Sequence, residues 1–523
     1  MKKKENLVLP ILDELKHRAA WKWAQSKSKS AKDHHHNRLM RILFGGGNNG
    51  HSTALDRLSD AINLNLNLNN LNLSSLNLNT LMAPKPPAIP RRVVVIGVHG
   101  WFPGRLLRNI TGTPTGTSQK FAEKMEQAVR MHFLDTTDTN LPPSSISSIS
   151  LEGHGKVEDR VDKLHAQIMR PDSGYAKAIQ DADTVLVAAH SQGCPVSVML
   201  FARLVREGFI DPSRQRVCLL LMAGISHGPF PHLKSSVVLK VEADAARQLF
   251  DFNDPTASIT KRYHAAISQV LNAGIRICCV GSWYDQVVPL YSAVLHAFNH
   301  PSIFRAIHID GADYSPDFLS HLVVFALRLR NAGLSDRGLL VYLSEFLQGN
   351  VYGFGTQGHS TIYEETDTYS LGVQWAFAQP IPYSYQQMKD SIHSQNNSSK
   401  PKCCNPYDPL DPSLHTSSND LVPPSPHVTD PKPPFEPSRD NPVSDYLLSS
   451  DAVFHTKFTA PVAKLNPYWL PWIMAQIVND PLVYDNEFLR PHLDEVIRLY
   501  NDWEPKGKEK ELEHRLEPLR SRL

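Results

Sequence analysis

The feature that most constrains the fold of this chain is a series of short, mostly apolar segments separated by segments with helical periodicity. The apolar segments stand at 93–98, 184–189, 217–222, 275–280 and 303–309, with a weaker one at 146–151. Helical spacing of apolar residues marks the stretches between them, including 119–133, 157–168, 194–205 and 257–272. Strands that are apolar on both faces belong to parallel sheets covered by helices on both sides. The pattern therefore predicts an α/β fold with a mostly parallel sheet.

Beyond the last of these strands the pattern becomes less regular. Two helices are expected near 317–331 and 339–348, and a glycine-rich loop follows them. Between 369 and 377, large apolar residues alternate with small or polar ones, which is typical of a strand with one buried face. We therefore expect one further strand after the main sheet.

Composition changes along the chain divide it into five parts. Residues 1–90 are predicted to be disordered, since they combine a basic arm, a leucine and asparagine repeat at 62–81 and the proline-rich stretch PKPPAIP. The globular domain is expected at 91–385. A disordered insertion rich in Ser, Asn and Pro is expected at 386–450, then a helical and strand segment that packs on the domain at 451–505, and a charged tail at 506–523.

Overall composition excludes several classes of protein. The formal net charge is only +2, which gives no case for nucleic acid as a partner. The six cysteines show no CxxC spacing, and no metal or cofactor is expected. The chain has no apolar run long enough for a spanning helix and no secretory signal, so we expect an intracellular protein, cytoplasmic or peripheral on an organelle membrane. The basic N-terminus allows three interpretations: contact with an anionic membrane, a mitochondrial presequence, or a solvated arm.

The strongest motif is Ala189-His190-Ser191-Gln192-Gly193, which joins an apolar strand directly to a helix. This is the strand–turn–helix setting of a nucleophile elbow, in which small flanking residues allow a tight turn. The serine hydroxyl would project above the sheet at a helix N-terminus, where the Gln192 amide can stabilise a developing oxyanion. The alternative interpretation of Ser191 is an ordinary helix N-cap.

A second motif, His99-Gly100, ends the strand VVVIGV upstream of the elbow. Together the two motifs resemble the α/β-hydrolase superfamily, in particular its lipase-like and esterase-like members, over roughly residues 91–360. The resemblance implies an α/β-hydrolase fold and an oxyanion hole formed by the backbone N–H groups of Trp101 and Gln192. The chain departs from the usual pattern in having Ala189 at the first elbow position and a bulky Trp101.

The acid and the base of a catalytic triad are sought after the elbow. Asp285 follows the apolar strand IRICCVGS and stands in Asp-Gln-Val-Val-Pro, which resembles the superfamily's acid loop; a helix-capping aspartate is the alternative. Two histidines follow it as possible bases. His359 lies in a glycine-rich loop as Gly-His-Ser, whereas His321 lies on an apolar helical face where a packed histidine is normal. We predict that His359 is the base and keep His321 as the alternative.

These residues predict a serine hydrolase that cleaves carboxylic esters, with lipid-like esters as the first substrate class and Ser191, Asp285 and His359 as the triad. Two alternatives stay open: an acyltransferase that uses the same serine, and an inactive scaffold that keeps the fold. Peripheral membrane contact is a further hypothesis. It would use the basic N-terminus or an aromatic face that includes Trp469 and Trp472, for which packing on the core is the alternative. The oligomeric state is not predicted.

Overall fold

The structure is a computed structural model of the 523-residue chain. It describes residues 6–13, 89–101, 116–235, 243–311, 317–344, 347–348, 358–379, 454–455, 469–505 and 510–522. The leucine and asparagine repeat at 62–81 and the predicted insertion at 386–450 lie outside the described residues.

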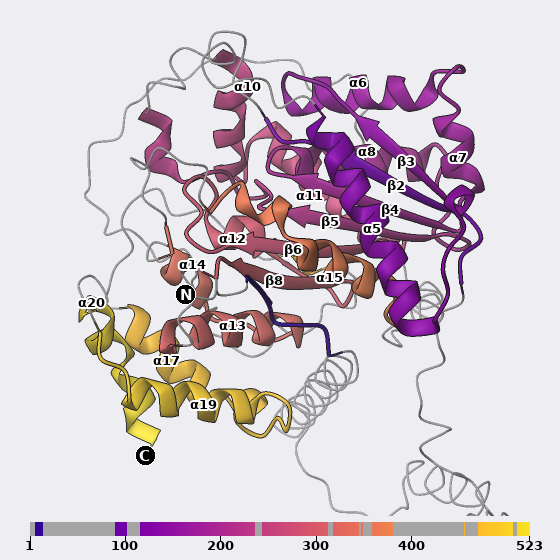
Figure 1. The fold of residues 1–523 in the computed structure, drawn as a ribbon. Helices are drawn as coiled ribbons and strands as arrows, with labels where there is room; N and C mark the ends of the chain where they lie inside the picture. Colours follow the sequence, from indigo (N-terminus) through magenta and orange to yellow (C-terminus); the bar gives the residue numbers. More distant parts are fainter. Residues whose placement is uncertain are drawn as a thin grey trace, which may run out of the picture.

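The centre of the fold is a seven-stranded sheet in the order β1-β8-β6-β5-β4-β2-β3 (Figure 1). Every neighbouring pair is parallel except β1 and β8, which are antiparallel. The strands are β1 (Leu7–Leu9), β2 (Val93–Val98), β3 (Ile146–Leu151), β4 (Thr184–His190), β5 (Arg216–Met222), β6 (Arg276–Ser282) and β8 (Ile303–Ile309). A separate two-residue pair joins β7 (Phe298–Asn299) to β9 (Phe454–His455). The predicted parallel α/β sheet is confirmed.

Alternate residues of each central strand enter two different apolar clusters, one on each face of the sheet. In β2, Val93 and Val95 belong to one cluster while Val94 and Ile96 belong to the other. The first face is covered by α5 (Thr117–Thr137) and α15 (Thr366–Phe377), which lie across the sheet in Figure 1. The second face is covered by α6 (Val157–Met169), α8 (Gly193–Arg206), α11 (Ser258–Asn272) and α13 (Phe318–Asn331). Burial on both faces explains why the strands read as continuous apolar runs.

Short elements complete the connections. They are η1 (Pro143–Ser145), α7 (Tyr175–Asp181), η2 (Pro231–Ser235), α10 (Ala243–Gln248), η3 (Leu249–Asn253), α12 (Leu290–Ala293), α14 (Leu339–Ser344) and η4 (Thr361–Glu364). The segment from η2 to η3 follows β5, where this fold commonly carries a cap. Its Gln248 accepts a hydrogen bond from the Val157 N–H at 2.8 Å and so ties this segment to α6.

The strand predicted at 369–377 is wrong, because these residues form helix α15. Both Gly372 and Ala376 lie on the buried side, and a Cβ placed on Gly372 would contact the Leu220 side chain at 3.3 Å. The helix lies beside α5 on the same face of the sheet and contacts β5 and β6, and eight of its twelve residues are buried. The alternation of large residues is thus a consequence of burial on several sides and does not reflect a period of two.

The prediction that residues 1–90 are disordered throughout is wrong for the segment around β1. Leu7–Leu9 pairs with the edge of β8 in the register Val8 opposite His308, and Val8 is buried. Asn6 adds a hydrogen bond to Glu365 at 2.7 Å and accepts one from the Gly311 N–H at 2.8 Å. An edge strand presents unpaired backbone groups, and β1 satisfies those of β8.

The C-terminal part packs beside α13 and α14 as α17 (Trp469–Val478), α18 (Pro481–Tyr484), α19 (Arg490–Asn501), α20 (Lys510–Glu513) and η6 (His514–Arg522) (Figure 1). The prediction of a charged tail at 506–523 is wrong in its described part, because Leu512, Leu516 and Leu519 are fully buried. These leucines recur every three or four residues between charged side chains, and they allow η6 to pack against α17. Half of the residues of α17 are also buried, but Trp472 is 67% exposed. Among the described residues, no helix has both the length and the apolar character to cross a bilayer.

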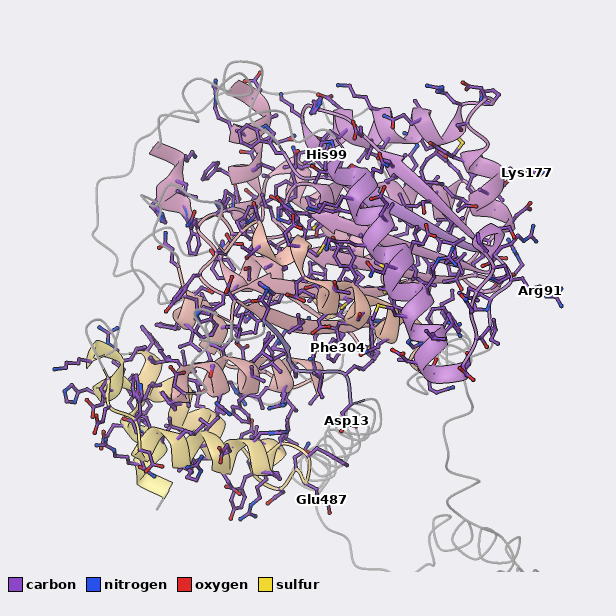
Figure 2. All side chains as sticks on the ribbon, viewed as in Figure 1. Asp13, Arg91, His99, Lys177, Phe304 and Glu487 are labelled. Atoms are coloured by element: carbon purple, nitrogen blue, oxygen red, sulfur yellow. The ribbon has the colours of Figure 1, made fainter. Side chains whose placement is uncertain are left out.

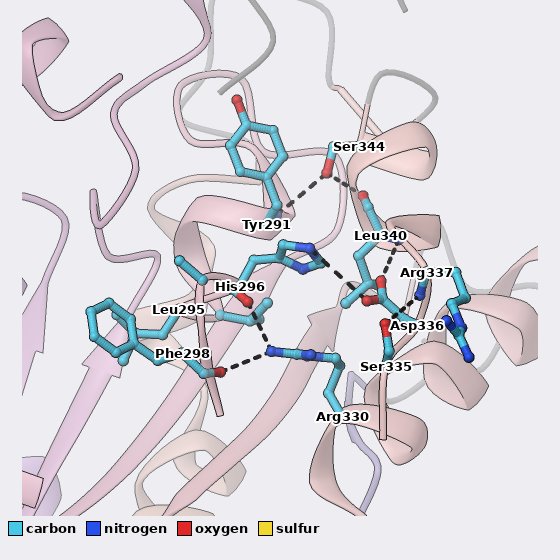
Figure 3. Close-up of polar contacts among 12 residues, drawn as sticks. Tyr291, Leu295, His296, Phe298, Arg330, Ser335, Asp336, Arg337, Leu340 and Ser344 are labelled. Carbon is cyan, nitrogen blue, oxygen red and sulfur yellow. Dashed lines mark hydrogen bonds and ion pairs between the residues drawn. The ribbon is translucent and has the colours of Figure 1, made fainter. Parts of the chain in front are cut away.

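A buried polar cluster lies between α12, α13 and α14 (Figure 3). Arg330 donates hydrogen bonds to the carbonyls of His296 and Phe298, both at 2.8 Å. Asp336, which is 1% exposed, accepts from the Leu340 N–H at 2.9 Å and lies 4.0 Å from the His296 ring. Asp336 thus satisfies an N–H in the first turn of α14, where no helical partner exists, and Arg330 satisfies carbonyls of the turn and strand that follow α12.

Candidate active site

Ser191 stands between the end of β4 and the start of α8, at the carboxyl edge of the sheet. Its φ of 54° lies in the left-handed region, which is unusual for a residue with a side chain. The Ser191 N–H donates to the Met222 carbonyl on the neighbouring strand at 2.9 Å, which holds this turn in place. A sharp, strained turn at this point is the geometry of a nucleophile elbow.

Two glycines allow the elbow to lie against the loop that follows β2. A Cβ on Gly193 would be 2.5 Å from the His99 carbonyl oxygen and 2.6 Å from that of Val98. A Cβ on Gly100 would be 3.0 Å from Ser191 Cβ. Only glycine permits such close backbone approach. Gly193 of the elbow and Gly100 of the loop after β2 therefore allow the same close contact, each from its own side.

Asp285 follows β6 and is oriented by its own turn. Its Oδ1 accepts hydrogen bonds from the N–H groups of Val287 at 2.7 Å and Val288 at 2.8 Å. Its Oδ2 lies 2.9 Å from His359 Nδ1. Because a carboxylate can only accept these bonds, the His359 proton sits on Nδ1. Asp285 is 3% exposed, so this pair is shielded from water.

His359 reaches the site from the loop before η4. Its Nε2 lies 3.1 Å from Ser191 Oγ, within hydrogen-bond distance. The preceding Gly358 has a φ of 83°, and a Cβ there would overlap the Tyr284 carbonyl. The Ser282 hydroxyl donates to the Gly358 carbonyl and fixes the loop on β6. The structure thus brings Ser191, His359 and Asp285 into one hydrogen-bonded series.

The alternative base, His321, lies elsewhere. It is on α13, and its Nδ1 donates to the Asp317 carbonyl one turn earlier at 2.9 Å. This is the packed helical histidine that its apolar surroundings indicate.

A second histidine, His190, holds the backbone of His359, and nothing in the sequence indicated this role. His190 Nε2 donates to the His359 carbonyl at 2.8 Å, and the two ring centroids are 4.7 Å apart. Burial and the neighbouring His359 hold the pKa of His190 well below its ordinary value. His190 is therefore neutral, with its proton on Nε2, and fixes the backbone that carries His359.

The loop after β2 is held by several bonds. The His99 N–H donates to Ser118 Oγ at 3.0 Å, and His99 Nδ1 lies 2.5 Å from the Gly100 carbonyl. A carbonyl only accepts, so His99 is the donor in that contact. Figure 2 shows His99 at one end of β2 and Arg91 at the other, which puts the loop at the same sheet edge as Ser191. Trp101 closes the described part of the loop and is partly buried.

Gln192, directly after Ser191, is fully buried. Its side chain accepts from Arg160 at 2.8 Å and donates to the Gly155 carbonyl at 3.1 Å. Among the described residues, its backbone N–H donates to no other backbone or side-chain group. Arg160, on α6, gave no signal in the sequence because it reads as one charged residue on an amphipathic helix. A search of the described residues for clusters of His, Cys, Asp and Glu suited to a metal ion finds none.

Comparison with known proteins adds a classification. The model of the YMC0/YMC35 alpha/beta hydrolase domain matches residues 60–408, well over half of the chain. A search of curated proteins finds no match.

Among solved structures, phospholipase PlaB from Legionella pneumophila aligns with a TM-score of 0.26 and 14% identity, over 39% of this chain and 44% of PlaB, so the chain spans under half of PlaB's length. The structure titled for LipS and LipT, two metagenome-derived lipolytic enzymes, aligns with a TM-score of 0.25 and 12% identity, over 46% of this chain and 92% of that one.

Proposed function

Because the chain belongs to the YMC0/YMC35 alpha/beta hydrolase family and is a hydrolase of that fold, we propose that it is a serine esterase cleaving carboxylic esters. Ser191 is the nucleophile, His359 the general base and Asp285 the residue that orients it. The observation that carries this proposal is the pair of distances of 3.1 Å from His359 Nε2 to Ser191 Oγ and 2.9 Å from His359 Nδ1 to Asp285 Oδ2. Together they match the hydrogen-bonding order of a catalytic triad.

The proposed reaction has two steps. His359 Nε2 takes the Ser191 proton as Oγ attacks the ester carbonyl, and the resulting oxyanion accepts hydrogen bonds from the N–H groups of Trp101 and Gln192. His359 then gives the proton to the leaving alcohol, and an acyl group remains on Ser191. In the second step His359 deprotonates a water molecule that attacks the acyl carbonyl, and it then returns the proton to Ser191 Oγ as the bond to the acyl group breaks and the acid leaves. Asp285 stabilises the imidazolium that forms each time.

Lipid-like esters are the proposed substrate class. Tyr284, next to Asp285, is 40% exposed and follows the buried Trp283, so an aromatic rim borders the acid loop. The strongly exposed Trp472 supports a second proposal, peripheral contact with a membrane surface at α17. An intracellular location at such a membrane is part of the same proposal.

Labelling with a fluorophosphonate, followed by peptide mapping, tests the proposal directly. The expected result is a covalent adduct on Ser191 and hydrolysis of short p-nitrophenyl esters by the wild-type protein. Ser191→Ala is expected to lose both, with little change in the thermal unfolding midpoint. Ser197→Ala is the matched control, since Ser197 is a buried serine on the following helix whose hydroxyl has no hydrogen-bond partner among the described residues.

Three outcomes would redirect the assignment. Wild-type ester hydrolysis in Ser191→Ala would refute Ser191 as nucleophile. A protein that is labelled but transfers the acyl group to an added alcohol faster than to water would be an acyltransferase. A folded wild-type protein with neither labelling nor hydrolysis would be a scaffold that keeps the hydrolase fold.

A further inference from the structure

Arg160 is a buried arginine that links two loops of the candidate active site. It lies on α6, outside the sheet, and its side chain is only 1% exposed. Its Nη2 donates to the His99 carbonyl at 2.8 Å, and its Nη1 donates to the Gln192 side-chain oxygen, also at 2.8 Å. One guanidinium therefore holds the end of β2 and the residue after Ser191 at once.

No carboxylate among the described residues forms a hydrogen bond with Arg160. Within the described part of the chain, its hydrogen bonds go to neutral oxygens, and its Nε is buried without a partner. Burial lowers the pKa of Arg160 to about 10, so the group is still protonated at neutral pH. Burying the charge of an arginine without an acidic partner costs free energy. The role of Arg160 therefore concerns the active site and not the stability of the core.

The two bonds act on the parts of the chain that carry the proposed oxyanion donors. The carbonyl of His99 precedes Gly100, whose backbone lies against Ser191, and the next residue is Trp101. The His99 ring donates to the Gly100 carbonyl and so orients the peptide that bears the Trp101 N–H. On the other side, Gln192 is locked by Arg160 and by the Gly155 carbonyl.

We propose that Arg160 is a positioning residue that fixes the separation of the two oxyanion-hole loops and places an uncompensated positive charge behind them. The inference rests on the proposed esterase function. It predicts that Arg160 acts on the tetrahedral species and has little effect on binding of the ester in its ground state, because the developing charge exists only in the former.

Two substitutions of Arg160 test this role in the full chain. Arg160→Met keeps the volume and removes both bonds and the charge, while Arg160→Lys keeps the charge and can make one of the bonds. The measured quantities are kcat and KM for a p-nitrophenyl ester, the inhibition constant of phenylboronic acid and the thermal midpoint. The boronic acid forms a tetrahedral adduct with Ser191 Oγ, and one of its oxygens occupies the oxyanion hole.

For Arg160→Met we expect kcat to fall by about 10- to 100-fold with KM nearly unchanged, since misplacing or losing an oxyanion donor has effects of this order. The affinity for phenylboronic acid should weaken by a similar factor. Arg160→Lys should recover part of both losses. Arg330→Met is the matched control, because Arg330 is also buried and donates to two backbone carbonyls, but in the cluster of Figure 3. It should lower the thermal midpoint and leave kcat unchanged.

If Arg160→Met does not fold, Gln192→Met replaces it, since this change removes the side-chain bonds of Gln192 to Arg160 and to the Gly155 carbonyl and leaves the bond of Arg160 to His99 in place. The same fall in kcat and in boronate affinity at constant KM is then expected. Wild-type kcat and boronate affinity in a folded Arg160→Met or Gln192→Met variant would overturn the inference while leaving the esterase assignment intact. A wild-type protein that neither hydrolyses esters nor binds the boronic acid would overturn both.

Discussion

Substituting Gly193 by alanine should damage the active site although it adds only one methyl group. The new Cβ would lie 2.5 Å from the His99 carbonyl oxygen and 2.6 Å from the Val98 carbonyl oxygen. Both neighbours are backbone atoms, one in the last residue of β2 and one in the residue that follows it, so neither can rotate away. Relieving the overlap requires α8 and the end of β2 to separate by roughly 0.5–1 Å, since packed atoms are in contact at about 3.5 Å.

The expected loss follows from this displacement. Overpacking of this kind destabilises a protein by about 1–3 kcal/mol, and alanine in a helix returns at most about 1 kcal/mol relative to glycine. A misplacement of about 1 Å at a catalytic site lowers the rate by up to ~100-fold. We therefore expect Gly193→Ala to lower the thermal midpoint by several degrees and kcat/KM for a p-nitrophenyl ester by about 10- to 100-fold.

Gly153→Ala is the control, because a Cβ there would meet the Leu164 side chain at an ordinary 3.4 Å. It should change stability by less than about 0.5 kcal/mol and leave the rate unchanged. If Gly193→Ala kept both the wild-type midpoint and the wild-type kcat/KM, the close approach of the elbow to the β2 loop would not limit the site, and the reasoning would be refuted.

Three further predictions concern the triad, the sheet edge and pH. Asp285→Asn should lower kcat by about 10³- to 10⁴-fold with little change in KM, because His359 would lose the acceptor that keeps its proton on Nδ1; a mild effect in steady-state kinetics would contradict the triad. Deleting residues 1–13 should lower the urea midpoint by removing the bonds of β1 to β8 and the burial of Val8, and an unchanged midpoint would show that the strand pair adds no stability. Burial lowers the pKa of His300 to about 3, so this ring is neutral when folded and binds a proton below about pH 6.5 when unfolded. Stability should therefore be full above pH 6.5 and fall towards pH 3 by up to about 1.4 kcal/mol per pH unit from this group, and His300→Asn should show a shallower fall in thermal scans.

The sequence by itself determined the sheet and the elbow, since these depend on local patterns. Apolar runs of strand length that alternate with helical segments are typical of parallel strands covered on both faces, and the tight turn around Ser191 requires small neighbours. Asp285 was predicted from its place after an apolar strand and from the resemblance of its loop to the acid loop of the superfamily. The choice of His359 over His321 also followed from local context, because a helix interior packs its side chains whereas a glycine-rich loop can reach the sheet edge. The structure brings the three named residues together.

Only the tertiary structure decided which segments far apart in the sequence pack against the sheet and the elbow. The period of Tyr369–Phe377 indicates a strand, yet the part of the sheet beside α5 is covered by a helix that is buried on several sides. The free edge of β8 pairs with Leu7–Leu9, which lies about 300 residues away along the chain. Arg160 is one charged residue on an amphipathic helix until folding places it between His99 and Gln192. Local sequence encodes the conformation of a segment, but such contacts depend on the positions of backbone groups that only the assembled sheet and helices bring within hydrogen-bond distance.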